Sequence, residues 1–328
     1  MLAVGPNGAG KTNLLESLHV GTQGFSPRTR TDSQLIRFGT QSARIVLEAS
    51  RCQAPMQISV SLSNREAKRA TLNGARLQTA EQLRREADTL VFTPDRLTVV
   101  KGGPAARRAY FDRVFGRLQP ARASLSVEYG GAVAQRNAAL RRASAGLSSR
   151  EAIAPWTERV ATLGAELVAA REEVLHALLT LFAERAAELG LEGALLTYEG
   201  DAPSTDELNA RLDRDLERGA TSLGPHLDDV RIAAGGRDLR SYGSQGEQRV
   251  TVLSLLLAEA ELLTERRATP PLLLLDDVLS ELDPERRQVL VARVSSVGQT
   301  LVTATQRSAL PGQPAQLLEV SRGVVKTA

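Results

Sequence analysis

The sequence predicts an α/β domain into which a mainly helical lobe is inserted. Strand-like segments, either apolar or alternating, occur near both ends of the 328-residue chain. Between about residues 104 and 218, apolar residues instead recur at helical spacing, with alanine, glutamate and arginine between them. We therefore assign residues 1–104 and 221–328 to the α/β domain and residues 105–220 to the helical lobe.

The segments of the α/β domain follow from local patterns. A glycine-rich turn separates the first apolar segment from an apolar-periodic helix, and Asn73-Gly74 marks a hairpin turn. We expect helices at residues 11–20 and 248–263. We expect strands at residues 2–4, 43–49, 57–62, 90–92, 230–233, 272–275 and 301–303.

The composition is that of a folded protein from a reducing compartment. Hydrophobic residues make up 42% of the chain, and the single cysteine, Cys52, excludes an internal disulfide. The first ten residues lack the basic and apolar regions of a signal peptide. The longest apolar run, residues 270–275, is far shorter than the ~20 residues that span a bilayer. We expect a cytoplasmic protein.

Positive charge is concentrated in the first part of the helical lobe. The chain carries a net charge of +3, but residues 101–142 contain nine basic and two acidic residues, which gives +7 for that segment. Such asymmetry is typical of proteins that bind a polyanion, although a solvated helix surface would also produce it. We predict DNA contacts from Arg107, Arg108, Arg136 and Arg141.

The aromatic content bears on the kind of DNA. Aromatic residues make up 3% of the chain, so a base-stacking platform for single strands is not expected. We expect duplex or junction binding that weakens with salt. Three aromatic residues of the lobe, Tyr110, Phe111 and Trp156, are expected in its core.

Residues 5–12 fit the G-x-x-x-x-G-K-[ST] pattern of a phosphate-binding loop. The pattern lies between an expected strand and an expected helix, as this motif requires. Its glycines let backbone N–H groups turn toward phosphate oxygens, and the helix N-terminus adds partial positive charge. Lys11 would reach the β- and γ-phosphates of ATP, and the Thr12 hydroxyl would bind Mg²⁺. We predict nucleotide contacts from Gly5, Pro6, Asn7, Gly8, Ala9, Gly10, Lys11, Thr12 and Asn13.

Two carboxylates follow the apolar run at residues 272–275. Such a run is typical of a strand buried on both faces, and ligands bind at the carboxyl ends of strands in doubly wound sheets. Asp276 is placed to hold Mg²⁺, and Asp277 is placed to polarise the water that attacks the γ-phosphate. Adjacent acids can also begin a turn, but their coincidence with the phosphate-binding loop favours catalysis.

A serine-led helix and a short acidic segment complete the pattern. Ser244 can cap the helix that follows it, and with Gln245 and Gly246 it resembles the signature helix of ABC-type ATPases. That helix closes over the γ-phosphate bound by the opposite subunit. Residues 280–283 resemble the segment that these ATPases place across the dimer interface, so Asp283 joins the predicted nucleotide contacts.

Further phrases resemble the RecF family over almost the whole chain. The resemblance implies a two-lobed head of the ABC/SMC P-loop type without a long coiled coil. It also implies ATP-dependent dimerisation on DNA, slow ATP hydrolysis, and recombinase loading at gaps with the RecO and RecR mediators. The phrases are the SQGEQR sequence at 244–249, FTPDRL at 92–97, VKGGP at 100–104, Arg107-Arg108, Phe111-Asp112, Gln135-Arg136-Asn137, and Gly224-Pro225-His226 with Asp228-Asp229.

The chain departs from the family pattern in three places. It begins almost on the phosphate-binding loop, where the family has additional strands, so we hypothesise an upstream start or a degraded copy. Leu227 stands where the family has arginine, which puts a charged contact in doubt. Asp277 agrees with the family where transporters have glutamate, and the shorter side chain suits slow turnover.

Other functions were weighed against this hypothesis. A transporter ATPase subunit should carry a switch histidine after the acidic strand, where this chain has residues 303–306, Thr-Ala-Thr-Gln. A DNA-binding module with a non-hydrolysing nucleotide pocket would also fit an abrupt start. A nuclease is less consistent, because the paired acids are explained by Mg²⁺ and ATP. His226 with Asp228 and Asp229 could resemble a metal site or lie near the γ-phosphate, although such a histidine is more often structural.

Overall fold

We describe the protein from a computed structural model that covers residues 1–29, 31–51 and 54–328. Cys52, the single cysteine on which the prediction of no internal disulfide rests, lies outside the described residues. The chain forms two compact units. Unit 1 comprises Met1–Arg96 and Leu263–Ala328, and unit 2 comprises Leu97–Leu262.

The boundaries of these units differ from the predicted domains. Residues 221–262 group with the helical segment rather than with the α/β ends of the chain. One physical reason is that strand β8 of this stretch, Asp229–Ala234, pairs antiparallel with β7, Leu195–Glu199. The chain passes from unit 2 to unit 1 inside one long helix, α10, Gln245–Arg267.

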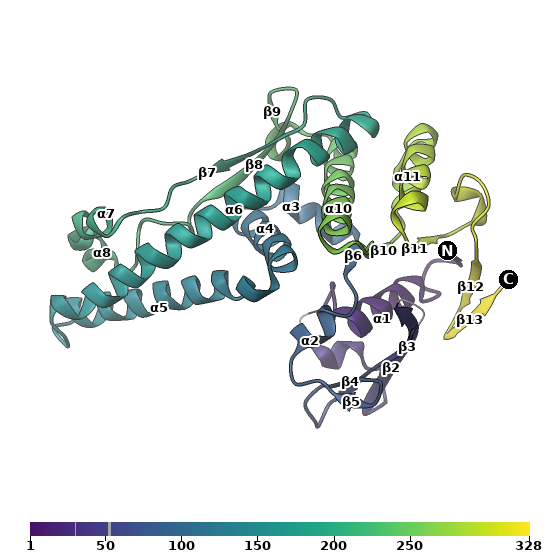
Figure 1. Ribbon diagram of the computed structural model, residues 1–328, viewed down its shortest axis with the longest axis horizontal. Helices are drawn as coiled ribbons and strands as arrows, with labels where there is room; N and C mark the ends of the chain where they lie inside the picture. The colour runs from purple at the N-terminus through teal and green to yellow at the C-terminus, as the bar shows by residue number, and fades with distance from the viewer. Residues whose placement is uncertain (30, 52–53) are drawn as a thin grey trace. The chain divides into compact units, whose positions relative to one another are not determined.

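The centre of unit 1 is a six-stranded sheet in the order β13-β12-β1-β11-β10-β6 (Figure 1). The strands from β12 to β6 are parallel to their neighbours, and β13 pairs antiparallel with β12. Apolar side chains from β1, β6, β10, β11 and helix α1 form a common core, as the unbroken apolar strands require. The bounds are β1 Leu2–Val4, β6 Thr89–Phe92, β10 Leu272–Leu275, β11 Thr300–Ala304, β12 Leu317–Ser321, β13 Val324–Thr327 and α1 Lys11–Gln23.

A second sheet of unit 1 is antiparallel, in the order β2-β3-β4-β5. Asn73 and Gly74 have positive φ angles of 49° and 83° and connect β4 to β5, which confirms the predicted hairpin turn. The bounds in this part are β2 Ser42–Arg51, β3 Ala54–Ser63, β4 Arg69–Leu72, β5 Ala75–Arg76, α2 Ala80–Arg84 and the 3₁₀ helix η1 Asp32–Leu35. The remaining elements of unit 1 are η2 Pro94–Leu97, η5 Val278–Glu281, α11 Pro284–Val297 and η6 Arg307–Ala309.

Unit 2 is built on two long helices, α5 Leu125–Ser144 and α6 Ala154–Glu188, which run side by side (Figure 1). Tyr110 and Phe111 are buried, as predicted, but Trp156 is 37% exposed and lies on the outer face of α6. That core prediction is wrong, because the neighbouring Thr157 rather than Trp156 faces α5. The other elements are α3 Thr98–Lys101, α4 Pro104–Leu118, η3 Pro120–Arg122, η4 Arg150–Ile153, α7 Thr205–Ala210, α8 Leu212–Arg218, β9 Arg237–Asp238 and α9 Leu239–Tyr242.

No helix in the described ranges is both long enough and apolar enough to cross a membrane.

Candidate nucleotide site and nucleic-acid surface

The parallel strands of unit 1 bring their carboxyl ends to one edge of the sheet. β1 leads into the phosphate-binding loop, β10 leads into Asp276 and Asp277, and β11 carries Thr303 near its end. Since β11 lies between β1 and β10, these three segments meet there although they are far apart in sequence. This is the edge at which open α/β sheets bind ligands.

The phosphate-binding loop has the backbone that its glycines allow. Gly8 and Gly10 have φ angles of 78° and 106°, which other residues adopt only with strain. A Cβ atom on Gly5 would lie 2.2 Å from the carbonyl oxygen of Val320, so the close approach of loop and β12 requires glycine. No side chain caps the first turn of α1, whose N–H groups are therefore left for a ligand.

Lys11 is held across this loop. Its side chain is 8% exposed, and Nζ donates to the carbonyl oxygens of Gly5 at 2.7 Å and Pro6 at 3.1 Å. The loop carbonyls thus fix an ammonium group beside the uncapped first turn of α1. Such a combination of fixed positive charge and backbone donors suits a polyphosphate.

Thr12 and Asp276 are in direct contact although 264 residues separate them. The Thr12 hydroxyl donates to Asp276 Oδ2 at 2.9 Å and lies 3.1 Å from Oδ1. The hydroxyl of Thr303 donates to Asp276 Oδ1 at 2.7 Å. The carboxylate of Asp276 is 7% exposed and is oriented from both sides by these hydroxyls.

Asp277 lies in the left-handed region of backbone conformation. Its φ angle of 49° is unusual for a side chain other than glycine, and strain of this kind concentrates at functional sites. Its backbone N–H donates to Thr303 Oγ1 at 2.9 Å. Its Oδ1 atom is buried and, among the described residues, has no hydrogen-bond partner. A buried carboxylate oxygen with no partner is poised to accept a hydrogen bond from a bound molecule.

The donor set at this edge fits a magnesium nucleotide. Oxygen ligands from a hydroxyl and a carboxylate are what Mg²⁺ prefers, and Mg²⁺ usually takes its remaining ligands from water and phosphate. The described residues contain no group of three or more histidine, cysteine, aspartate or glutamate side chains that could hold a metal ion.

Thr303 was missed by the sequence analysis, which considered its segment only for a switch histidine. In the structure its hydroxyl donates to Asp276 and accepts from the backbone of Asp277, so it orients both acids. A usable signal was present: a threonine closes the strand next to the acidic strand, and strand neighbours end at the same edge.

The predicted signature segment forms a capped helix start in unit 2. The backbone N–H of Glu247 donates to Ser244 Oγ at 3.2 Å, and the N–H of Ser244 donates to Glu247 Oε2 at 2.7 Å. This reciprocal capping box explains why α10 begins at Gln245, three residues earlier than expected. The exposed Ser244 and the half-buried Gly246 stay predicted contacts to a nucleotide on a second subunit.

In unit 1, Asp283 also caps a helix. Its Oδ1 accepts from the backbone N–H of Arg286 at 2.9 Å at the start of α11, and this hydrogen bond lowers the pKa of the Asp283 carboxyl. Its second oxygen lies 3.4 Å from the Arg286 guanidinium. The role of Asp283 across a dimer interface stays a prediction.

Two of the four arginines predicted to contact DNA face the interior of unit 2. Arg107 is 4% exposed and forms a two-point ion pair with Asp229. Arg136 has no exposed surface and pairs with the equally buried Asp215 at 2.7 Å. The DNA role predicted for these two residues is therefore corrected: the arginine-rich pattern does not distinguish a cation that ties helices together from one that faces solvent.

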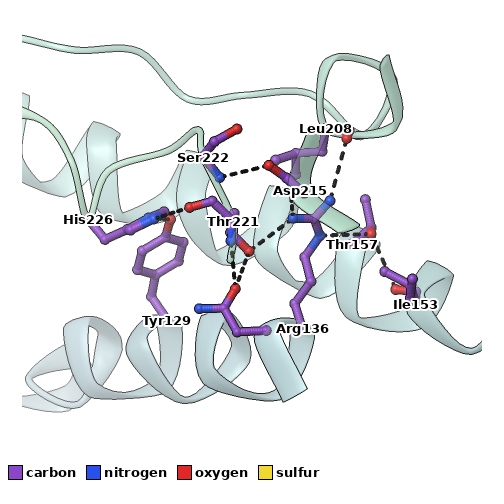
Figure 2. A network of polar contacts seen from close by, with 10 residues as sticks. Tyr129, Arg136, Ile153, Thr157, Leu208, Asp215, Thr221, Ser222 and His226 are labelled. Carbon is purple, nitrogen blue, oxygen red and sulfur yellow. Dashed lines mark hydrogen bonds and ion pairs between the residues drawn. The ribbon is translucent and has the colours of Figure 1, made fainter. Parts of the chain in front are cut away.

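Arg136 is the centre of a polar network that links four helices and the loop before β8 (Figure 2). Its guanidinium donates to the hydroxyls of Thr157 and Thr221 at 3.1 and 2.9 Å and to the carbonyl oxygen of Leu208 at 3.4 Å. The second oxygen of Asp215 accepts from the N–H of Ser222 at 3.1 Å. Each guanidinium nitrogen of Arg136 and both carboxylate oxygens of Asp215 thus have a hydrogen-bond partner, which is the requirement for burying an ion pair.

The remaining two arginines are accessible. Arg108 is half-buried and donates to the carbonyl oxygen of Asp228, and Arg141 is exposed and donates to that of Gly219 at 3.2 Å. Neither forms an ion pair with an acidic side chain in the described part of the chain. Burial lowers the pKa of Arg108, and Asp229, Asp112 and Asp228 partly offset this effect, whereas Arg141 is exposed. They stay predicted DNA contacts.

His226 belongs to the interior of unit 2. One ring nitrogen, Nδ1, lies 2.8 Å from the Tyr129 hydroxyl, and Nε2 lies 3.2 Å from the carbonyl oxygen of Thr221 (Figure 2). Burial lowers the pKa of His226, which favours the neutral ring. With Asp229 paired to Arg107 and Asp228 bonded to the Tyr198 hydroxyl, these three residues form no metal site. The exposed Leu227 takes no part in the network.

Comparison with known proteins agrees with this geometry. The family model described as "RecF/RecN/SMC N terminal domain" matches residues 1–324. The chain is 38% identical to the "DNA replication and repair protein RecF" of Myxococcus xanthus, covering 96% of this chain and 87% of the relative. It is 35% identical to the protein of the same name from Heliobacterium modesticaldum, covering 96% and 88%.

Solved structures show the same relationship. The "recombination mediator protein RecF-ATP in RecFOR pathway" superposes with a TM-score of 0.87 at 26% identity, covering 100% of this chain and 91% of the other. An SMC head bound to the C-terminal winged-helix domain of ScpA has a TM-score of 0.59 at 18% identity and shares the fold. The predicted fold class, an ABC/SMC-type P-loop ATPase head with a helical lobe, is confirmed, and the chain belongs to the RecF family.

Proposed function

We propose that this protein is an ATP-dependent DNA-binding protein of replication and recombinational repair. It binds duplex DNA at gaps as an ATP-dependent homodimer and aids recombinase loading, with slow ATP hydrolysis. The observation that carries the proposal is the contact of Thr12 with Asp276, beside the buried and unpartnered oxygen of Asp277. Family membership supports it, since relatives are named for DNA replication and repair and one was solved with ATP.

Within the site, each residue has a separate task. Lys11 and the N–H groups at the start of α1 bind the β- and γ-phosphates. Thr12 and Asp276 are the residues that would hold Mg²⁺, which supplies charge neutralisation between the phosphates when bound. Asp277 accepts a hydrogen bond from the attacking water and orients it in line with the γ-phosphate. Thr303 positions both acids.

Dimerisation would complete the site from a second copy. The exposed hydroxyl of Ser244 and the N-terminus of α10 suit the γ-phosphate of an ATP molecule on the partner, and Asp283 would lie at the same interface. Binding of ATP then favours the dimer by mass action, because the dimer binds the nucleotide more tightly than the monomer does. Hydrolysis removes that preference and releases the DNA.

DNA contacts are proposed from the accessible arginines of unit 2, Arg108 and Arg141. Contacts of this kind bind phosphates and position the duplex without reading its sequence. Membership of the RecF family supports RecO and RecR as partners, since a solved relative is described as part of the RecFOR pathway.

The test is fluorescence anisotropy of a labelled gapped duplex titrated with protein, with ATP and with ADP, at two salt concentrations. We expect binding that is tighter with ATP and weaker at the higher salt concentration. Ser244→Arg should abolish the advantage of ATP over ADP, because its side chain would occupy the γ-phosphate position of the partner. Equal binding with ATP, with ADP and without nucleotide would contradict the proposal and favour a DNA-binding module with a silent nucleotide pocket.

A further inference from the structure

The most exposed large apolar side chain of the described protein belongs to Phe38, whose surface is 102% accessible. It lies between η1 and β2 in unit 1. Single surface hydrophobics are common, but full exposure of an aromatic ring leaves its whole apolar area in water.

A fixed turn holds Phe38 outward. The N–H and the hydroxyl of Thr40 both donate to the carbonyl oxygen of Arg37, at 3.0 and 2.8 Å, which closes a four-residue turn. Gly39 has a φ angle of 85°, as the third position of a type II turn requires. Ile36, two residues before Phe38, is 8% exposed and packs in the core with β3 and α1. The turn and the buried Ile36 thus fix the backbone around Phe38, so the ring lies in solvent at a defined position.

A second loop lies beside this turn. The N–H of Asn64 donates to the carbonyl oxygen of Gln41 at 3.1 Å, and Ser42 pairs with Ser63 at the ends of β2 and β3. The hydroxyl of Ser63 accepts hydrogen bonds from the backbone N–H groups of Arg65 and Glu66, at 3.1 and 3.3 Å, which shapes the turn around Arg65. Residues 37–44 and 63–69 therefore form one end of the antiparallel sheet, which we name the Phe38 end.

The charge of the Phe38 end is positive. Residues 37–44 and 63–69 contain five basic residues and one acidic residue, a net +4. The nearby acids are neutralised, because Asp32 lies 2.9 Å from Lys68, and Glu66 lies 2.8 Å from Arg69. Within the described chain, neither Arg37 nor Arg65 forms an ion pair, and both are exposed. A fully exposed ring at the same end of the sheet as two exposed arginines matches the chemistry of a nucleic acid, with a base for the ring and phosphates for the cations.

We propose that Phe38 stacks on an unpaired base at the single-strand to double-strand boundary of a gap, while Arg37 and Arg65 bind the flanking phosphates. The proposal deepens the proposed function and rests on it, because it specifies how a gap is distinguished from an intact duplex. One ring at a boundary agrees with a chain whose aromatic content is too low for an extended single-strand platform. Paired bases inside a duplex offer no exposed face, so the contact requires an unpaired base, which a gap supplies and the interior of an intact duplex does not.

The experiment compares two labelled DNAs of equal length, a gapped duplex and a blunt duplex, with the full chain and ATP. Phe38→Ala should lower the affinity for the gapped DNA by about 5- to 100-fold, the range found for loss of one stacked base. It should leave the affinity for the blunt duplex and the melting temperature unchanged, because the ring contacts no other part of the fold. Phe38→Trp should retain the preference for the gap, whereas Phe38→Leu, which lacks a planar face, should lose it.

The salt dependence of DNA affinity tests the phosphate contacts proposed for Arg37 and Arg65. The double substitution Arg37→Gln and Arg65→Gln should reduce the slope of log affinity against log salt by about 1.5. Arg76→Gln is the matched control, since Arg76 is exposed on the same sheet but lies next to the β4–β5 hairpin turn, and it should change nothing.

Three outcomes separate this inference from the function on which it rests. Unchanged gap binding by Phe38→Ala, with normal ATP-dependent binding by the unmodified protein, would overturn the stacking contact alone and favour a protein partner for the ring. Equal weakening on both DNAs would also overturn it. If the unmodified protein binds neither DNA in the presence of ATP, the proposed function fails as well.

Discussion

Two regions contain the same kinds of side chain but differ in whether those side chains pair with one another. One is the edge of the unit 1 sheet that carries Lys11, Thr12, Asp276, Asp277 and Thr303, which we call the nucleotide edge. The other is the Arg136 network of unit 2. Each combines a cation, an aspartate and threonine hydroxyls that come from distant parts of the chain. In unit 2 the charges pair with each other and are completely buried. In unit 1 the cation is held by loop carbonyls, helix N–H groups lack a cap, and Asp277 Oδ1 has no partner among the described atoms.

A binding site and a structural network can therefore be distinguished by whether their buried donors and acceptors satisfy one another. A network whose donors and acceptors satisfy one another has no capacity left for a ligand, so its value is in the stability and definition of the fold. A set of buried polar groups whose donors and acceptors do not meet is costly unless a ligand completes it. Substitutions in the two regions should therefore affect different measurements.

The largest effect is expected for Asp277→Asn. The amide is similar in size but is a poor acceptor for the proton of the attacking water, so phosphate release should fall by about 10²- to 10⁴-fold. ATP binding should persist, because Lys11 and the loop N–H groups are untouched. Phosphate release at the original rate would show that Asp277 does not orient the water.

Arg136→Ala tests the structural side of the comparison. It leaves Asp215 buried without its partner, so the free energy of unfolding should fall by about 3–5 kcal/mol. Denaturant unfolding measures the loss, and ATP affinity of the folded fraction should be unchanged. A milder effect is expected when Asp215→Leu is combined with Arg136→Met, because no buried charge then remains. Loss of DNA binding without loss of stability would instead restore Arg136 as a DNA contact.

Thr303→Val sharpens the description of the nucleotide edge. Valine keeps the shape but removes the hydroxyl that orients Asp276 and the backbone of Asp277. Loss of such a supporting hydrogen bond typically costs about 10- to 100-fold in activity or metal affinity. We expect slower phosphate release that needs a higher Mg²⁺ concentration to reach half of its maximum, with little change in the melting temperature. Thr305→Val, two residues beyond on an exposed segment, is the control and should behave like the unmodified protein.

The smallest effect concerns pH and His226. Burial lowers the pKa of this histidine in the folded protein, and the unfolded chain therefore binds more protons below about pH 6.5. Its contribution to stability is constant above that pH and is lost as the pH falls toward the folded pKa. Burial raises the pKa of the neighbouring Asp228, and this shift favours the folded protein as the pH falls, opposite to the effect of His226. The contribution of His226 alone is therefore measured as the difference between the unmodified protein and His226→Gln. The substituted protein should lose less stability between pH 7 and pH 5 in thermal unfolding; an identical decrease would show that His226 does not titrate differently on folding.

Much of the fold and of the nucleotide site could be predicted from the sequence. The glycines at fixed spacing before an apolar helix and the two acids after four leucines are patterns of neighbouring residues. Such patterns can be recognised in the sequence without knowledge of distant contacts. The roles of individual arginines could not be predicted in this way. Arg107, Arg136 and Arg141 all lie in alanine-containing helical segments, and the distant partners Asp229 and Asp215 account for the inward position of the first two. The threonine at the end of the expected strand 301–303 was a usable signal, but its place beside Asp276 follows only from the order of the strands.

The central claim is that the edge of unit 1 holds a magnesium nucleotide, and thermal unfolding with increasing ATP tests it most directly. We expect the melting temperature to rise with ATP concentration in the presence of Mg²⁺, to rise less without Mg²⁺, and to stay unchanged in Lys11→Ala, as binding to the folded state alone requires. Arg136→Ala should melt at a lower temperature but show the same ATP-dependent rise. A melting temperature that does not respond to millimolar ATP and Mg²⁺ in the unmodified protein would contradict the account.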